Sequence, residues 1–259
     1  MGAPLIWVQD MAMPVRALGT LVAAVGLCLL ARVPMLAQAD VVDPDILYAN
    51  REDLAQARAA AAAWEARLVT TPRDFEAAWK LARAAYWLGG HVPADERRQL
   101  YERGIEAGRL AVSLEPERAE GHFWLAADMG AMAEFFGLRM GLRYRGPVRL
   151  ELETVLRIDP AYQQGSADRA LGRWHLRVPW LFGGRKDESV AHLRRSLTYD
   201  PTNAASHFFL AETLLSMDRD DEARAELAAV LEAPEDHEWG PEAREFKMRA
   251  RVLLTRVDR

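Results

Sequence analysis

Cysteine is almost absent from this sequence: the 259 residues contain one, Cys28, which lies inside an apolar stretch near the N-terminus. One cysteine cannot close an internal disulfide, complete a zinc cage or act as the nucleophile of a Cys–His pair at that place. The scarcity of cysteine therefore excludes a disulfide-stabilised scaffold and a cysteine-based metal site.

Catalytic signatures are missing too. The sequence has no Gly-x-Ser-x-Gly elbow, no Walker loop and no Gly-x-Gly-x-x-Gly turn. No histidine stands in a His-Glu-x-x-His arrangement or at a compelling metal spacing with another; the six are His91, His122, His175, His192, His207 and His237. These absences predict a protein that is not an enzyme and that uses no cofactor and no metal.

Positive charge is in deficit, with 33 Lys and Arg against 38 Asp and Glu and a formal net charge of −5. The charges look interspersed, and no segment stands out as the basic cluster of a nucleic-acid binder. Eight Trp and eight Phe are too many for a disordered chain. The composition predicts a globular protein that does not bind nucleic acid.

The first forty residues have the parts of a secretory signal peptide. An apolar run from Ala17 to Ala31 follows Arg16, and Ala37-Gln38-Ala39 precedes Asp40. The run is shorter than the roughly 20 residues that cross a bilayer. We expect cleavage after Ala39 and a periplasmic or secreted protein. The alternative is an uncleaved anchor, extended by residues 33–37, and only that alternative would attach the chain to a membrane.

A recurring helix ending is the clearest pattern in the rest of the chain. An apolar helical run stops at an acidic residue followed by proline, at Glu115-Pro116, Asp159-Pro160 and Asp200-Pro201. Proline cannot continue a helix and turns its predecessor away from helical angles, so each one is a stop. From the degenerate copy at Pro72, the prolines are 44, 44 and 41 residues apart. This spacing predicts stacked helix pairs.

The stops divide a single helical domain, residues 40–259, into units at about 73–116, 117–160, 161–201 and 202–234. A helix at 53–70 precedes them, and a capping helix at about 241–257 follows. Insertions are expected around 91–98 and 130–146, and a loop at 178–184. Apolar residues recur at three- and four-residue steps, and no segment alternates like a strand. The prediction is an all-α fold.

The last unit resembles a tetratricopeptide repeat, with Leu210, Ala211 and Leu214 on its first helix and Ala223, Leu227 and Val230 on its second. The resemblance implies a right-handed superhelix of about four helix pairs. In this frame His122 and His207 occupy the same position of their units, which indicates that they pack one helix against the next.

Longer phrases resemble a narrower group: residues 78–86, 101–108 and 171–175, with Pro179 and the loop Gly183-Gly184. They look like the T-component (TatT-like) proteins associated with TRAP transporters, and equally like the helical domain of the regulator-of-microtubule-dynamics proteins. The first resemblance implies a periplasmic protein that partners a solute-binding protein and has a channel for an apolar ligand. Well-known members are lipoproteins, whereas Leu27 precedes Cys28 here and leaves no usable lipobox.

Apolar side chains in the expected insertions suggest a site. Those between the helices of the second unit are Phe135, Phe136, Leu138, Met140, Leu142 and Tyr144, and those in the loop of the third are Trp180, Leu181 and Phe182. They either cover a core or line a cleft for an apolar ligand or a partner's segment. Its candidate lining is Phe135, Phe136, Met140, Tyr144, Trp180 and Phe182, and its candidate polar rim is Arg139, Arg143 and Arg145.

Two functions follow from these patterns. The first is an exported scaffold or accessory protein that binds a protein partner, since stacked helix pairs present an extended concave surface. In a TRAP-type uptake system that partner would be a periplasmic solute-binding protein. The alternative is a carrier of a small apolar ligand in the cleft between the insertions.

Overall fold

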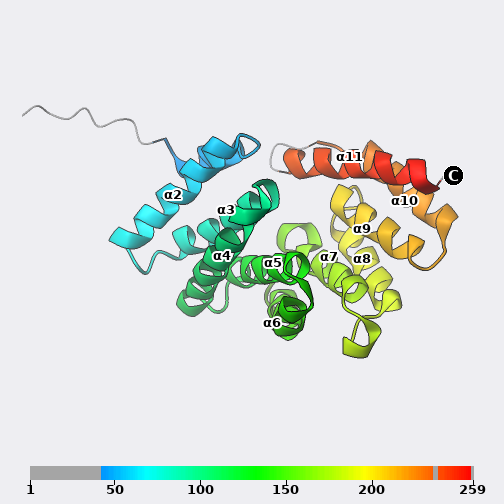
Figure 1. Cartoon of the computed structure of the whole chain (residues 1–259), viewed down its shortest axis with the longest axis horizontal. Helices are drawn as coiled ribbons and strands as arrows, with labels where there is room; N and C mark the ends of the chain where they lie inside the picture. Colours follow the sequence, from blue (N-terminus) through cyan, green and yellow to red (C-terminus); the bar gives the residue numbers. More distant parts are fainter. Residues whose placement is uncertain (1–41, 236–238, 258–259) are drawn as a thin grey trace, which may run out of the picture. The chain divides into compact units, whose positions relative to one another are not determined.

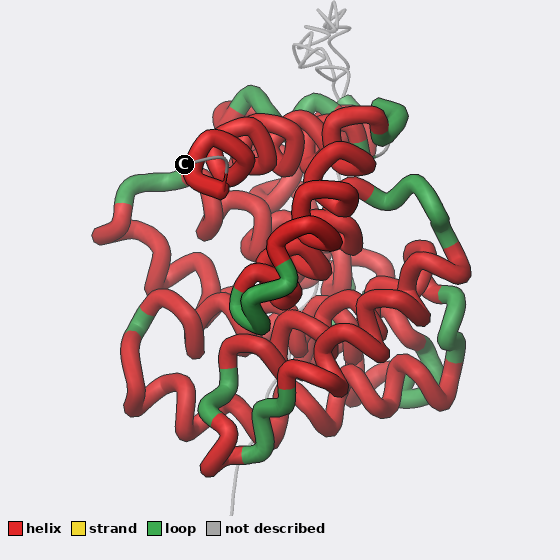
Figure 2. The backbone as a smooth tube through the Cα atoms, turned by 90° about the vertical axis from the view of Figure 1, so that its right-hand side faces the viewer, coloured by secondary structure: helices red, strands yellow, loops and turns green. Residues whose placement is uncertain are grey.

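The computed structural model describes residues 42–235 and 239–257, and in these ranges every regular element is helical (Figures 1 and 2). The all-α prediction is therefore confirmed for the described residues, while the expected signal peptide and its cleavage site lie outside them. The helices are α1 Pro44–Ala49, α2 Leu54–Thr70, α3 Phe75–His91, α4 Ala94–Leu114, α5 Ala119–Phe135, α6 Gly137–Ile158, α7 Tyr162–Arg177, the 3-10 turn η1 Trp180–Phe182, α8 Lys186–Tyr199, α9 Ala204–Leu215, α10 Asp220–Glu232 and α11 Gly240–Val257.

The predicted stops end the second helix of three pairs. Helices α4, α6 and α8 end one residue before Glu115, Asp159 and Asp200, and a proline follows each acidic residue. Several helix starts are capped: the side chains of Asp74 and Asn203 accept hydrogen bonds from backbone N–H groups of the first turn. Local chemistry thus sets where these helices begin and end.

Four antiparallel pairs, α3/α4, α5/α6, α7/α8 and α9/α10, follow one another (Figure 1). In the part of the chain from residue 42 onwards, the first helices of the pairs line the inner side of an arch and the second helices its outer side. The arrangement is the tetratricopeptide-like superhelix that the sequence predicts. None of the described helices combines the length and the apolarity needed to span a membrane.

The expected insertions at 91–98 and 130–146 are wrong as irregular segments, because the helices themselves are longer. Helix α3 reaches His91 and α4 starts at Ala94, and only Phe136 separates α5 from α6. Pro147 lies inside α6, where a proline removes one backbone hydrogen bond. The helix continues through it because its buried side chains recur at helical spacing: Tyr144, Val148, Leu152 and Val155.

Glycine is required at two of the close approaches. A Cβ on Gly108 would lie 2.9 Å from the Cα of Leu125, so its absence lets α4 and α5 pack backbone to backbone. In the loop before α8, Gly183 has a φ of 102°, as expected for a turn that needs positive φ. A Cβ on Gly184 would collide with the carbonyl oxygen of Val178, so glycine lets that loop close tightly.

The third pair starts differently from the others. Gln163, Gln164 and Gly165 have left-handed backbone angles, with φ between 45° and 72°. Two extra residues lie between Pro160 and the helix register that the neighbouring repeats share. The left-handed segment absorbs them, and α7 then packs in the common register.

Candidate functional site

Helix α11 does more than cap the last repeat, because its inward side chains reach both ends of the arch. Towards the N-terminus, Glu242 accepts hydrogen bonds from Arg51 at 2.5 and 3.2 Å, and Glu245 contacts His91. Towards the C-terminus, Phe246 packs on the rings of the fourth repeat, and Arg249 lies 3.9 Å from Glu212. The helix therefore closes the inner side of the repeats.

The middle of this inner side is formed by α5, which has small residues there. Ala127, Gly130 and Glu134 lie on one face of α5, at steps of three and four residues. A Cβ built on Gly130 would meet no atom within 4 Å. Open space therefore lies over the centre of α5, bounded by the larger side chains of α3 and α7.

Three arginines form a stripe on α7, at Arg169, Arg173 and Arg177. Arg173 bridges neighbouring repeats, since it donates to Glu134 of α5 at 2.6 Å and lies 3.5 Å from Glu212 of α9. Arg177 lies 3.8 and 3.6 Å from the same two carboxylates. Glu134 and Glu212 thus pair with two arginines of α7, and Glu212 also with Arg249 of α11.

Arg169 is the arginine of the stripe that has no acidic partner within 4.0 Å among the described residues. Its guanidinium makes only long contacts of 3.5 Å, with the carbonyl of Gln164 and the hydroxyl of Ser206. Burial lowers the pKa of Arg169 to about 10. A half-buried cation without a carboxylate partner among the described residues is available to bind an anionic group.

Tyr86 of α3 faces the same space from the other side. Its ring is 41% exposed and lies 5.9 Å from the ring of Trp124. Burial nevertheless raises the pKa of Tyr86, while the charge of Arg173 lowers it. Tyr86 thus packs on Trp124 of α5 while its side chain stays open to solvent.

A pocket of about 320 Å³ adjoins the arginine stripe between α7, α9 and α11. Its lining is half apolar and half polar: Leu176, Leu215, Leu253, Arg177, Glu212 and Ser216. The inner face therefore offers charged groups and an apolar recess side by side. We call the residues Tyr86, Gly130, Glu134, Arg169, Arg173 and Glu212, together with this pocket, the inner face.

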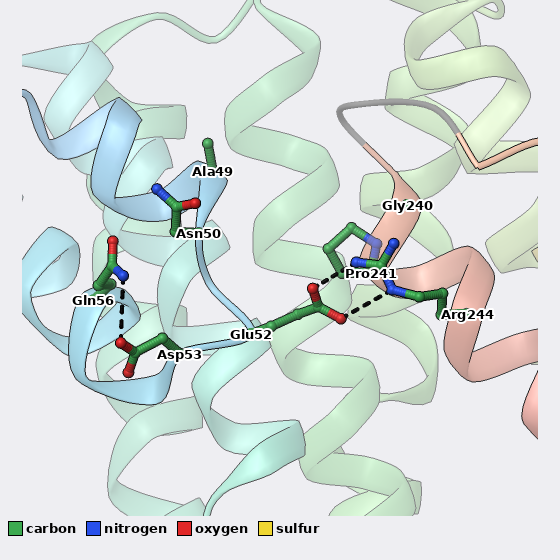
Figure 3. Close-up of a pocket in the computed structure, with 8 residues that line it drawn as sticks. All are labelled: Ala49, Asn50, Glu52, Asp53, Gln56, Gly240, Pro241 and Arg244. Carbon is green, nitrogen blue, oxygen red and sulfur yellow. Dashed lines mark hydrogen bonds and ion pairs between the residues drawn. The ribbon is translucent and has the colours of Figure 1, made fainter.

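A second pocket, of about 450 Å³, lies where α11 meets the N-terminal helices (Figure 3). Glu52 reaches across it to Arg244 at 2.5 and 3.2 Å, while Asp53 and Gln56 face each other on the opposite side. Its walls are polar and largely satisfied among themselves. The pocket marks the closure of the arch rather than a receptive surface.

His122 ties three parts of its repeat together. Its Nδ1 lies 2.5 Å from a carboxylate oxygen of Glu151 on the second helix, and its Nε2 lies 2.9 Å from the carbonyl oxygen of Pro116 in the preceding turn. The hydrogen bond with Glu151 raises the pKa of His122 against the opposing effect of burial. These contacts agree with the prediction that His122 packs one helix against the next.

His207 makes the same contacts two repeats later, with Glu226 at 2.5 Å and the carbonyl of Pro201 at 2.9 Å. Burial lowers the pKa of His207, but the hydrogen bonds with Glu226 and Pro201 outweigh it, so the pKa is raised. In the repeat between them the two residue types change places, with the carboxylate on the first helix and the histidine on the second. Asp168 there accepts from His192 at 2.6 Å.

The residues predicted to line a cleft are divided between core and surface. Tyr144 is buried in the central core, and Phe136 and Met140 pack against that core. Phe135 stacks on Tyr101, with ring centroids 6.0 Å apart, and half of it is exposed. These four side chains belong to one pair of helices and cover its interior.

The loop and the predicted rim do meet. Arg145 donates to the carbonyl of Phe182 at 3.2 Å, and its guanidinium lies 4.9 Å from the centre of the Phe182 ring. Trp180 projects into solvent, as do Arg139 and Arg143. The structure thus brings the two segments together at their surface, and a ligand-binding cleft between them stays a prediction.

The inner face was missed at the level of sequence, although one signal for it exists. Arginines four residues apart at Arg169, Arg173 and Arg177 place three cations on one helix face. Among the described residues, no group of three or more His, Cys, Asp or Glu side chains has the geometry to hold a metal ion.

Comparisons with known proteins agree with this architecture. Among solved structures, a thermophilic TPR protein from Thermus thermophilus is similar, with a TM-score of 0.62 and 24% identity over 82% of this chain and 97% of that chain. A structure of MamA has a TM-score of 0.47 and 14% identity, over 77% of this chain and 95% of that one. The first likeness shows the fold, and no curated protein matches the chain.

Family models cover most of the repeats. A tetratricopeptide repeat model matches residues 184–240. A model described as regulator of microtubule dynamics protein 1-3 matches residues 38–181, which is more than half of the sequence. The chain is a tetratricopeptide-like repeat protein, and it belongs to the regulator of microtubule dynamics protein 1-3 family.

Proposed function

We propose that this chain is an exported, non-enzymatic scaffold that binds a segment of a protein partner on its inner face. The observation that carries the proposal is Arg169, a half-buried guanidinium without a carboxylate partner among the described residues, on the same inner side as the open position at Gly130. Proteins of this repeat type typically bind other proteins on such concave surfaces.

The chemistry of the inner face favours a partner segment that carries both acidic and apolar side chains. A carboxylate from the partner would pair with Arg169. It would also compete with Glu212 for the neighbouring Arg173, because Glu212 is shared with other arginines. An apolar side chain would fill the recess formed by Leu176, Leu215 and Leu253. Mixed recognition of this kind fixes both the register and the orientation of a bound segment.

The non-enzymatic character is supported by how the titratable side chains are used. His122, His207 and His192 each bind a carboxylate that joins two helices of one repeat. The carboxylates of the inner face, Glu134 and Glu212, bind arginines. These groups stabilise packing and leave no base poised beside a nucleophile among them.

The partner we favour is a periplasmic solute-binding protein of a TRAP-type uptake system. The resemblance of residues 78–86, 101–108 and 171–175 to T-component proteins supports this choice, and the signal-like N-terminal sequence supports export. Mass spectrometry of the chain purified from its own host tests both parts. A mature chain starting at Asp40, with a solute-binding protein copurifying, is expected; an intact N-terminus in a cytoplasmic fraction would refute export.

The binding surface is tested by filling the floor of the inner face. Gly130→Trp places a large side chain where a Cβ meets no neighbour, so the fold is retained while the hollow is occupied. Leu150→Trp is the matched control, since Leu150 is 62% exposed on the outer helix α6. The Gly130 variant should lose the copurifying protein and the control should keep it. Equal recovery with both would place the partner elsewhere.

A carrier of a small apolar ligand is the second candidate, favoured by the contact of Arg145 with Phe182 between the two predicted segments. Native mass spectrometry of the purified chain would show a bound apolar molecule. Replacing Trp180 by Ala should then release it without loss of folding. A ligand-free wild-type chain would remove this candidate.

A further inference from the structure

Two segments of the chain are basic without any acidic residue. Residues 135–150 contain Arg139, Arg143, Arg145 and Arg149, and residues 178–186 contain Arg185 and Lys186. Neither segment has an aspartate or a glutamate, in a chain whose net charge is −5. The sequence-based impression of evenly interspersed charge is therefore wrong for this part of the molecule.

The fold places the two segments side by side. Arg145 of α6 donates to the carbonyl of Phe182 in η1 at 3.2 Å, and the backbone carbonyl of Arg145 accepts from the indole of Trp174 at 2.9 Å. The turn η1 thus contacts α6 at Arg145, and the exposed residues of the preceding turns of α6 lead up to this contact. We call the residues Leu138, Arg139, Leu142, Arg143, Arg145, Trp180, Leu181 and Phe182 the α6–η1 patch.

The apolar members of the α6–η1 patch stand in solvent. Trp180 is 79% exposed and Leu181 69%, and on α6 Leu138 is 71% and Leu142 42% exposed. Contiguous exposed apolar side chains on a protein surface mark an interaction site. Exposure this high in a three-residue turn means that Trp180 and Leu181 project into solvent.

The arginines of the patch are free to meet external anions. Arg139 and Arg143 are exposed and have no carboxylate within 4.0 Å in the described ranges 42–235 and 239–257. Among the described residues, the guanidinium of Arg145 contacts the carbonyl and the ring of Phe182 in the patch itself. On the inner face, by contrast, Glu134 and Glu212 pair with three arginines.

We propose that the α6–η1 patch docks the protein on the surface of a membrane that contains anionic lipids. Trp180, Leu181 and the two leucines would enter the interfacial region, where tryptophan is favoured. The guanidinium groups beside them would bind lipid phosphates while their stems stay in the apolar layer. The surface is separate from the inner face, so this proposal stands or falls independently of the scaffold function.

A lipid surface fits the patch better than a protein partner does. A projecting tip of tryptophan and leucine needs a deformable apolar layer or a matching pocket, and arginines spread along α6 need many anions at once. An anionic bilayer supplies both without a specific fit, as it does for amphipathic interfacial helices.

Vesicle binding of the full chain tests the proposal. Vesicles of phosphatidylcholine alone are compared with vesicles that also contain phosphatidylglycerol. The full chain is used with both, so the N-terminal segment is the same in every arm. Wild type should prefer the anionic vesicles and lose that preference in high salt. Arg139→Glu with Arg143→Glu should lower the partition coefficient by more than roughly tenfold, because each arginine near an anionic surface contributes roughly fivefold.

Matched variants separate the patch from general charge and apolarity. Arg251→Glu with Arg256→Glu changes the net charge equally on exposed positions of α11, and Val69→Ser with Val252→Ser removes exposed apolar groups elsewhere. Both controls should bind as wild type does, while Trp180→Ser with Leu181→Ser should not.

Three results would overturn the proposal. They are a wild type without preference for anionic vesicles, patch variants that bind like wild type, and controls that lose binding as much as the patch variants. Loss of a copurifying protein in patch variants that still bind vesicles normally would instead assign the patch to a protein partner. Circular dichroism of every variant confirms that it is folded.

Discussion

The inner face and the α6–η1 patch use the same residue type in opposite ways. On the inner face, Arg173 and Arg177 are held by Glu134 and Glu212, which come from neighbouring repeats. On the patch, Arg139 has no carboxylate within reach in the described ranges and lies among exposed leucines. Ion pairs hold arginine side chains in place on a surface, whereas exposed arginines beside apolar groups are suited to binding an anionic membrane. The pairing, and not the count of arginines, separates the two surfaces.

The buried side of α6 and the α6–η1 patch should differ most in their contribution to the free energy of unfolding, and two single substitutions test this difference. Tyr144→Ala removes a side chain buried in the central core and should lower the free energy of unfolding by about 3 to 5 kcal/mol. Trp180→Ala on the patch should change it by less than about 0.5 kcal/mol. Urea unfolding measures both. A large loss with Trp180→Ala would mean that the patch is part of the core.

The closure of the inner face by α11 is tested by Arg51→Ala. Arg51 is 3% exposed, binds Glu242 with two hydrogen bonds and lies over the rings of Tyr48 and Trp87. Its removal leaves the half-buried carboxylate of Glu242 without this partner and takes away the contacts of a buried side chain, which should cost about 3 kcal/mol. Amide hydrogen exchange should quicken in α11. Arg244→Ala, which breaks the exposed pair with Glu52, should do neither to a comparable extent.

A buried carboxyl group beneath the inner face should be dispensable. Asp128 is fully buried, neither of its oxygens has a hydrogen-bond partner among the described residues, and burial raises its pKa well above the usual value. Because the folded state holds this proton more tightly, wild-type stability falls as the pH rises from about 3.8 through the raised pKa. Asp128→Asn should therefore stabilise the protein by about 1 to 3 kcal/mol at neutral pH.

The gain should shrink towards acidic pH. Thermal melts of wild type and Asp128→Asn at a series of pH values measure it. A pH-independent difference would show that folding does not raise the pKa of this carboxyl group.

The smallest effect is expected from the histidine contacts. His122 and His207 have raised pKa values, so the stability they add is fully present below about pH 6.5 and is lost as the pH rises through their folded-state pKa. The double variant His122→Gln with His207→Gln should differ most from wild type in Tm at acidic pH. The difference should narrow at alkaline pH, and a constant gap would contradict the assigned shifts.

Much of the fold follows from local chemistry and was predictable for that reason. The stops at Pro116, Pro160 and Pro201 act through the backbone of one or two residues, and His122 and His207 share a register that the sequence displays. The helical state of residues 137–147 was not predictable locally. Its cause is the burial of Tyr144 together with side chains further along α6, which outweighs the cost of the internal proline.

The candidate site escaped prediction because its residues are far apart in sequence. Helix α11 closes the inner face through contacts of Glu242 with Arg51 and of Glu245 with His91, across more than 150 residues. No spacing rule connects such positions. The charge-swapped pair of Asp168 and His192 was hidden by the left-handed segment that shifts its repeat by two residues.

The most direct test of the account places a photo-reactive benzoylphenylalanine at Gly130 in one variant and at Trp180 in another. Irradiation of the full chain in its native host is followed by mass spectrometry of the adducts. We expect protein adducts at position 130 and lipid adducts at position 180. Absence of protein adducts at position 130, or the same adducts at both positions, would contradict this expectation.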